Sequence, residues 1–221
     1  MAAPAAPLDT RERLLTAALE AFGRRDYEGV SVRTICAAAN ANVAAISYHF
    51  GNKHGLYMAT AHYLVDGLHA GMADTLERVR QQTPDCEGAD CRRLLTDLLG
   101  GLARSVLFGP FADNAAAFIF REQNRPSAAF DILFDGLMRP MEESLATLVG
   151  RLLGVPADSR YITLLTHALV GQVIAFRAAR ETILRRLGQT TFNAQEVDEI
   201  ADLICQNTLA MLQGLAEGAS A

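Results

Sequence analysis

The segment from residue 43 to residue 53 (VAAISYHFGNK) concentrates side chains that suit contact with a DNA duplex. Methyl groups can contact the C5-methyl of thymine, and a serine hydroxyl can donate or accept at any base edge. A phenol, an imidazole and an ammonium group can each contact phosphate oxygens. The segment carries four small side chains and then these three polar groups, in the order Val43, Ala44, Ala45, Ser47, Tyr48, His49 and Lys53.

Lys53 is the only lysine in a chain with nineteen arginines. It falls at the expected start of a helix, where a cation opposes the helix dipole and so needs another reason for its presence. A phosphate contact would supply that reason. The alternatives are that Lys53 is merely solvated, and that His49 is a neutral histidine packed against its neighbours.

The elements that must position these residues are three short helices. Apolar residues at helical spacing predict one helix over about 10–24, a short second one capped by Ser31, and a third over 43–49. A three-residue turn joins the second and third, which is typical of a helix-turn-helix. In the third helix, Ile46 and Phe50 are expected to point inward, which leaves the small side chains outside.

The run from Ile35 to Tyr57 (ICAAANANVAAISYHFGNKHGLY) closely resembles the DNA-binding signature of the TetR/AcrR family of regulators. The segment FREQNRPSAAFDILFDGLMRPMEESL resembles the subgroup with a CecR-type C-terminal domain. Asn40 stands where the family usually has glycine, so it must adopt a left-handed conformation. Ser47 stands where tyrosine is usual. The signature matches at Ile46, Tyr48, His49, Phe50, Lys53 and Leu56.

The resemblance implies a role for individual residues of the first 52 positions. Arg33 matches a position from which some members reach a base edge, although it is equally suited to be a surface arginine. Base-edge contacts are implied for Val43, Ala44, Ala45 and Ser47. Phosphate contacts are implied for Tyr48, His49, Lys53 and Thr10.

The rest of the chain also shows helical periodicity, and we expect an all-α fold. It would comprise a helix-turn-helix DNA-binding domain over 1–52, with a disordered tail over 1–8, and a helical regulatory and dimerisation domain over 53–221. The stretch 81–90 is polar and predicts a loop. Beyond it, helices are predicted near 91–107, 112–124, 127–153 with an interruption at Pro140, 157–187 and 194–214.

Small residues recur along one side of the helix predicted over 157–187, at Ala168, Gly171, Ala175 and Ala178. Such a stripe lets another helix approach closely. The resemblance assigns this helix and the last one to a four-helix bundle that forms a homodimer, with Ile200, Ile204 and Met211 on the last helix. Packing within one subunit is the alternative.

Six of the ten phenylalanines fall between Phe108 and Phe134. They suggest either an ordinary core or an apolar cavity for an unidentified small-molecule effector. The cavity would be lined by Phe118, Phe134 and Met138, with Arg121 or Gln123 as its polar contacts.

The net charge of −5 divides into +1 for residues 1–60 and −6 for the remainder. The acidity therefore lies in the body and not in the DNA-binding head. No stretch approaches 18 uninterrupted apolar residues, and the N-terminus has no signal-peptide pattern, so we expect a cytoplasmic protein without a membrane partner. Cys36, Cys86, Cys91 and Cys205 are expected to be reduced thiols, with a redox role left open for Cys86 and Cys91.

The histidines show no metal-ligand spacing, and no nucleophile elbow or phosphate loop is present. These patterns disfavour an enzyme, and no cofactor or metal is expected. The expected function is that of a dimeric repressor, released from a palindromic double-stranded DNA operator by a small molecule. A helical small-molecule-binding protein or enzyme without DNA binding is the alternative, and activation in place of repression stays open.

Overall fold

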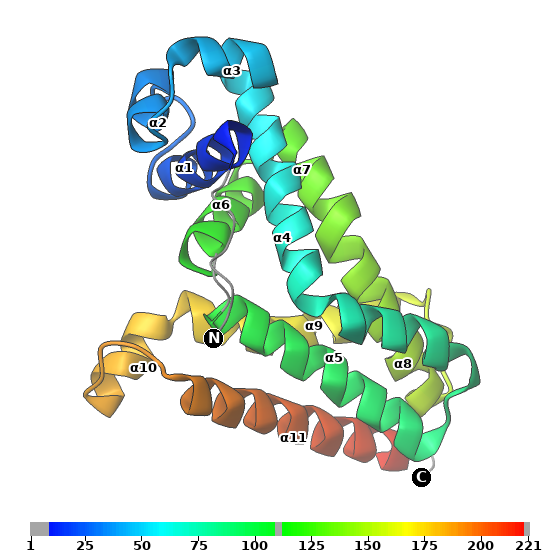
Figure 1. Ribbon diagram of the computed structural model, residues 1–221. Coiled ribbons are helices and arrows are strands. Elements are labelled where there is room, and N and C mark those ends of the chain that lie inside the picture. The colour runs from blue at the N-terminus through cyan, green and yellow to red at the C-terminus, as the bar shows by residue number, and fades with distance from the viewer. Residues whose placement is uncertain (1–8, 109–111, 219–221) are drawn as a thin grey trace, which may run out of the picture. The chain divides into compact units, whose positions relative to one another are not determined.

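A computed structural model describes residues 9–108 and 112–218, and every regular element in these ranges is helical, which confirms the all-α prediction (Figure 1). The tail expected over 1–8 lies outside the described residues. The α-helices are α1 (Thr10–Arg24), α2 (Val32–Ala38), α3 (Val43–Phe50), α4 (Lys53–Gln82), α5 (Gly88–Phe108), α6 (Ala112–Asn124), α7 (Ala128–Leu133), α8 (Arg139–Leu153), α9 (Arg160–Ala178), α10 (Arg180–Leu187) and α11 (Ala194–Gly218). A 3-10 turn, η1 (Thr83–Asp85), precedes α5, and a π-helical turn, η2 (Phe134–Met138), precedes α8.

The chain forms two compact units, and one division between them falls inside α4, after Gly67. The domain bounds of 1–52 and 53–221 stay a prediction. The first half of α4 packs on α1, since the rings of Phe22 and Tyr57 meet edge to face with centroids 4.8 Å apart. We call the two units the head and the body. The head consists of Met1–Gly67 and Asp113–Gly136, and the body of Leu68–Ala112 and Leu137–Ala221.

The head begins with a capping box, in which the Asp9 carboxylate accepts from the Glu12 amide and the Glu12 carboxylate accepts from the Asp9 amide. Arg13 of α1 donates from Nε to the Ala39 carbonyl at 3.1 Å and so holds the end of α2. The turn to α3 follows directly, and Asn40 adopts a φ of +47°, as predicted for this position.

The body is a bundle in which α5, α8, α9 and α11 enclose one apolar core. Figure 1 shows α5 and α11 side by side over most of their lengths. The contacts between them and the neighbouring helices bury leucine-rich faces, and this burial is the main stabilising term for such a bundle. The core includes Leu94, Leu95, Leu98 and Leu99 of α5, Leu145, Leu148 and Val149 of α8, and Ile162 and Leu169 of α9.

Three predicted boundaries need correction or comment. The helix expected over 157–187 is broken at Ala179, which leaves helical geometry (φ −102°, ψ 22°) although neither glycine nor proline marks the point. The loop expected over 81–90 is shorter, because α4 continues to Gln82 and α5 begins at Gly88. The interruption expected at Pro140 is confirmed, since η2 precedes it and Pro140 itself lies in the first turn of α8, where its missing N–H is tolerated.

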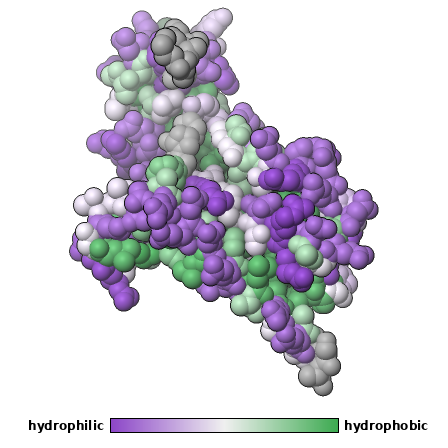
Figure 2. Space-filling view, turned by 60° about the horizontal axis from the view of Figure 1, so that its bottom comes forward, coloured by the Kyte–Doolittle hydropathy of each residue, from purple (hydrophilic) through white to green (hydrophobic). Residues whose placement is uncertain are grey.

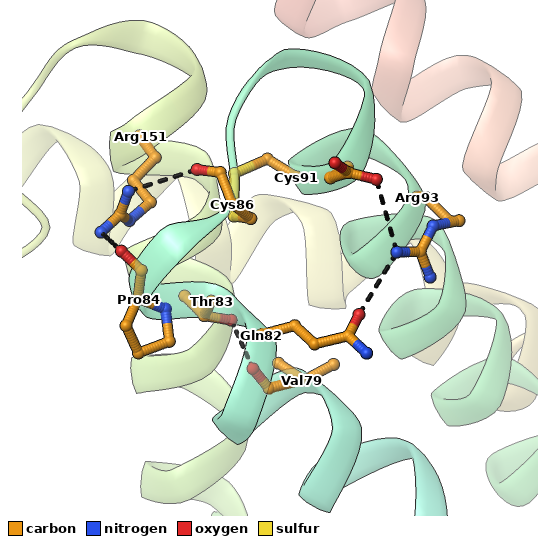
Figure 3. Close-up of a disulfide and its surroundings, with 9 residues drawn as sticks. Val79, Gln82, Thr83, Pro84, Cys86, Cys91, Arg93 and Arg151 are labelled. Carbon is orange, nitrogen blue, oxygen red and sulfur yellow. Dashed lines mark hydrogen bonds and ion pairs between the residues drawn. A yellow bond between two sulfur atoms is a disulfide. The ribbon is translucent and has the colours of Figure 1, made fainter.

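Cys86 and Cys91 form a disulfide, so the expectation that both are reduced thiols is wrong (Figure 3). The turn from η1 into α5 brings their Cα atoms within 5.2 Å of each other. The two cysteines are five residues apart, a spacing that matches no short cysteine motif and so does not signal the bond in the sequence. Arg151 of α8 donates to the carbonyls of Cys86 and Pro84 and holds the same turn from the other side. The remaining cysteines, Cys36 and Cys205, are free, as expected.

One helix among the described residues, α9, is long and apolar enough to cross a membrane by length and composition alone. Only 22% of its most apolar window is buried within this one chain. Most of this apolar window is therefore left uncovered by the rest of the described chain.

We expect reduction of the Cys86–Cys91 disulfide to lower the free energy of unfolding by about 2 kcal/mol, the loop-closure value for a ring of this size. The measurement is urea unfolding with and without a reducing agent. The double variant Cys86→Ser/Cys91→Ser should lose this dependence on reductant, whereas Cys205→Ser, at a free cysteine, should keep it. Four titratable thiols in protein purified without reductant would contradict the disulfide.

Candidate nucleic-acid interface

The third helix, α3, is held by its two ends and by one buried side chain. At its start, the Asn42 side chain accepts from the Ala44 amide at 2.9 Å, and at its end Gly51 turns the chain with a φ of +77°. Ile46 is buried against the other helices of the head, as predicted. Phe50 is half-buried, with the Arg11 guanidinium 5.8 Å from its ring centroid.

The face of α3 opposite Ile46 is open to solvent. Val43 is 43% exposed, and Ala44 and Ser47 are also exposed, whereas Ala45 is only half-exposed. An apolar, small-residue face of this kind gains nothing in water, but it lets the helix backbone approach the floor of a major groove. The structure thus brings three of the four expected base readers to one open surface, with Ala45 at its edge.

The expected phosphate contacts lie at the end of α3 and at the start of α4 and α1. Tyr48 is 85% exposed and packs edge to face on His49, which is half-buried against the Phe50 ring. The Thr10 hydroxyl, in the first turn of α1, accepts from Arg13 at 3.2 Å. Arg33 on α2 is exposed, and its guanidinium forms no hydrogen bond or ion pair with another described residue.

Lys53 begins α4, and its ammonium lies 4.2 Å from the centroid of the Tyr27 ring. This cation–π contact is a second reason for a cation at a helix N-terminus, and it holds the side chain in place without consuming its three donors for a phosphate. The sequence did not signal the contact, because the two residues are 26 positions apart and Tyr27 lies in an irregular connection.

The corner between α3 and α4 depends on Gly55. A Cβ at this position would lie 2.0 Å from the Phe50 carbonyl oxygen, so no other residue fits without moving one of the two helices. Asn52 supports the same corner by accepting from the Gly55 amide at 2.9 Å. The backbone therefore fixes the orientation of α3 relative to the start of α4. It also fixes where the residues expected to contact bases lie relative to Lys53.

A buried hydrogen-bond network supports the first turns of α4. The Tyr57 hydroxyl donates to Glu122 of α6 at 2.5 Å, and the same carboxylate accepts from the amide and the hydroxyl of Ser127, each at 2.9 Å. Glu122 is only 2% exposed. Burial, reinforced by the hydrogen bond to the Glu122 carboxylate, raises the pKa of Tyr57 far above its ordinary value.

Of the residues expected to line an effector cavity, four belong to the head and Met138 belongs to the body. Phe118 is fully buried beside Tyr57, and Phe134 stacks on Phe130. Arg121 donates to the Phe22 and Gly23 carbonyls at the end of α1 and pairs with Asp26 at 3.2 Å, so it caps that helix. Gln123 is exposed and Met138 is half-buried.

The residues expected at a dimer interface fall into two groups. Ala168, Gly171, Ala175 and Ala178 are all exposed on α9. On α11, Ile200 and Met211 are half-buried, while Ile204 is buried in the core of its own subunit with Ala103 and Val173. Among the described residues, no group of three or more metal-ligating side chains is present.

We expect Tyr57→Phe to destabilise the protein by about 1–3 kcal/mol, because one oxygen of a buried carboxylate loses its donor. The measurement is urea unfolding at neutral pH. Because the pKa of Tyr57 is raised on folding, its contribution is complete below the ordinary tyrosine pKa of about 10 and is lost at higher pH. The variant should therefore lose stability less steeply than the parent above that pH.

Tyr63→Phe is the matched control, since the Tyr63 hydroxyl contacts Thr16 at the surface at 3.2 Å. Its cost should stay within about 0.5 kcal/mol. Equal costs for the two variants would contradict the role given to the Glu122 network.

The fold and the open face of α3 define a helix-turn-helix DNA-binding protein. The model for bacterial regulatory proteins of the tetR family matches residues 14–60, and that for the C-terminal domain of the HTH-type transcriptional dual regulator CecR matches residues 91–215. The chain belongs to the TetR family, with a C-terminal domain of the CecR type, and is a DNA-binding transcriptional regulator.

Two curated relatives and a solved structure illustrate this relationship. The HTH-type transcriptional dual regulator CecR of Shigella flexneri is 32% identical over 210 residues, which are 94% of this chain and 93% of the relative. The HTH-type transcriptional repressor AcnR of Corynebacterium efficiens is 36% identical over 55 residues, 25% of this chain and 29% of AcnR. A TetR-like transcriptional regulator from Rhodococcus sp. RHA1 shares the fold, with a TM-score of 0.60 at 20% identity over 95% of this chain and 99% of that one.

Proposed function

We propose that this regulator is a homodimeric repressor that binds a palindromic operator in the cytoplasm and is released from it by a small-molecule effector. The observation that carries the proposal is the open face of α3, on which Val43, Ala44 and Ser47 are exposed just before the polar groups at the end of the helix. One such helix reads only a few base pairs, so a second copy is needed for a specific site. No catalytic step is assigned to the chain.

The exposed face of α9 is a suitable surface for packing against a second copy of the chain. Its exposed side carries Tyr161 (50% exposed) and Leu164 (54%), and the small residues from Ala168 to Ala178 continue along the helix. Leu203 of α11 is 47% exposed. Figure 2, which brings the bottom of the first view forward, shows green apolar patches among hydrophilic residues on the side of α10 and α11. An apolar helix with so little burial in one chain favours a partner helix over exposure to water.

In such an interface the exposed small residues of α9 would let the partner helix approach closely. Packing within one subunit does not use them, since they are exposed in the single chain. Ile204 is better placed in the core of its own subunit than at the contact. In a dimer of this kind, the two α3 helices would be spaced by about 34–36 Å to enter successive major grooves.

We expect Ala175→Glu to prevent dimerisation, because two carboxylates would meet in an apolar, water-excluded contact. The measurement is molar mass by light scattering across a range of concentrations, followed by operator binding. Ala73→Glu, at an exposed alanine of α4, is the matched control and should stay dimeric. A dimeric Ala175→Glu variant would place the interface elsewhere.

Phosphate contacts from the head predict a salt-dependent affinity for the DNA upstream of the protein's own gene. Lys53→Gln should weaken binding to all sequences alike and should reduce the slope of log affinity against log salt by about two, one contact for each of two heads. Lys53→Arg should keep most of the slope, and Arg92→Gln, at an exposed arginine of α5, should leave it unchanged.

Equal affinity for the upstream DNA and for scrambled DNA at one salt concentration would contradict the regulator's specificity. An unchanged salt slope in Lys53→Gln would remove the phosphate contact and leave Lys53 with its Tyr27 contact alone.

Activation at some promoters is a second candidate, because CecR of Shigella flexneri, the relative that spans nearly the whole chain, is named a dual regulator. A promoter reporter in cells with and without the protein distinguishes the two signs, since repression lowers transcription and activation raises it.

A further inference from the structure

The ammonium group of Lys53 lies against an aromatic ring and not against an acidic group. The centroid of the Tyr27 ring is 4.2 Å from Nζ, and within residues 9–108 and 112–218 the ammonium forms no hydrogen bond or ion pair. Two carboxylates are close to this ring in sequence, at Asp26 and Glu28, and Asp26 pairs with Arg121. The ring contact therefore leaves the charge of Lys53 uncompensated and its three donors available.

A carboxylate in place of the ring would also hold the ammonium, but it would oppose DNA binding. Its full negative charge would repel a backbone phosphate, and its oxygens would occupy some of the ammonium donors. The face of an aromatic ring attracts a cation through its quadrupole and carries no net charge. A neutral ring is therefore the better support for a lysine that contacts phosphate.

The Tyr27 ring is itself held by more deeply buried rings of the head. It stacks on Phe22 with centroids 6.0 Å apart, and it meets Tyr57 edge to face at 5.0 Å. Phe22 is fully buried and Tyr57 is nearly so, while Tyr27 is half-buried. Tyr57 is in turn held by its hydrogen bond to Glu122. These contacts give Tyr27 a defined ring orientation, although it lies in the irregular connection between α1 and α2.

Holding the ammonium before DNA arrives lowers the cost of the phosphate contact. A lysine side chain has about 2 kcal/mol of rotamer entropy, part of which is lost when its end group is fixed on a phosphate. The contact with Tyr27 already restricts Lys53 in the free protein. Less entropy is then lost on binding, and the affinity for DNA is higher than for an unrestrained lysine.

We propose that Tyr27 is a positioning residue for DNA binding, which acts by holding the Lys53 ammonium on its ring and not through a contact of its own with the duplex. The inference rests on the proposed function, in which Lys53 contacts a phosphate. It adds that this contact depends on the connection between α1 and α2 and, through Tyr57, on the buried Glu122 carboxylate.

Because Lys53 is the only lysine of the chain, its contact with the ring can be measured directly. Full-length protein labelled with carbon-13 lysine gives one set of lysine side-chain NMR signals. We expect the ε-methylene protons to be shifted upfield by the ring current of Tyr27, in the free protein and in its complex with the upstream DNA. The shift should be lost in Tyr27→Leu and kept in Tyr27→Phe, which retains the ring.

Binding to the upstream DNA at several salt concentrations is the functional test. Tyr27→Leu should weaken binding by about five- to thirtyfold, because each of two heads loses one cation–π contact. The salt slope should stay as in the parent, since the charge of Lys53 remains. Tyr27→Phe should bind like the parent. Tyr63→Leu, at another half-buried tyrosine of the head, is the matched control and should change neither the affinity nor the lysine signal.

A double-mutant cycle separates positioning from a general structural role. In the Lys53→Gln background, Tyr27→Leu should cause no further loss of affinity, because the two residues act as a unit. An equal loss in both backgrounds would show that Tyr27 supports the head and not the lysine, and would overturn the proposal. Parental affinity in Tyr27→Leu, or a Lys53 signal without a ring-current shift, would overturn it as well.

Lys53→Gln, measured alone in the same series, distinguishes failure of this inference from failure of the proposed function. A reduced salt slope together with equal losses in the two backgrounds would overturn only the role of Tyr27. An unchanged salt slope would remove the phosphate contact on which that role rests.

Discussion

The head of this regulator is organised around one buried negative charge. Glu122 lies almost wholly out of water, and a carboxylate in such a place is tolerated only when hydrogen-bond donors replace its lost hydration. Those donors come from α4 through Tyr57 and from the start of α7 through Ser127. The requirement therefore ties α4 to the turn between α6 and α7, two parts of the head that are distant in sequence. It also explains why residues 113–136 belong to the head and not to the body.

Local patterns in the sequence were sufficient to predict α3 and its open face, because each feature of this helix is coded within a few residues. Asn42 caps α3, Asn40 supplies the left-handed turn, and Ile46 alone anchors the helix, so periodicity and cap chemistry identify the whole element. The proposal that these exposed residues contact DNA comes from the family resemblance. The helix termini that carry such signals, as at the Asn193–Glu196 capping box of α11, were likewise predictable.

What the sequence did not reveal was long-range pairing. The contact of Lys53 with Tyr27, the hydrogen bond of Tyr57 to Glu122 and the capping of α1 by Arg121 each join residues far apart in the chain, and no periodicity encodes them. The phenylalanine-rich segment illustrates the difference. Its spacing along the chain fits an ordinary core or a cavity equally well, and only the structure shows that Phe118 is fully buried in the head and that Phe134 stacks on Phe130. The break of α9 at Ala179 also has no local signal.

The close approach of Gly55 to the Phe50 carbonyl has a consequence for how the DNA preference of this protein can change. Because this corner has no room for even a methyl group, the angle between α3 and the start of α4 cannot easily change. If Val43, Ala44 and Ser47 contact bases as proposed, a new DNA preference must arise by exchanging side chains at such positions, on a helix of fixed orientation. Specificity then changes through the identity of exposed side chains on α3, while the orientation of the helix stays the same.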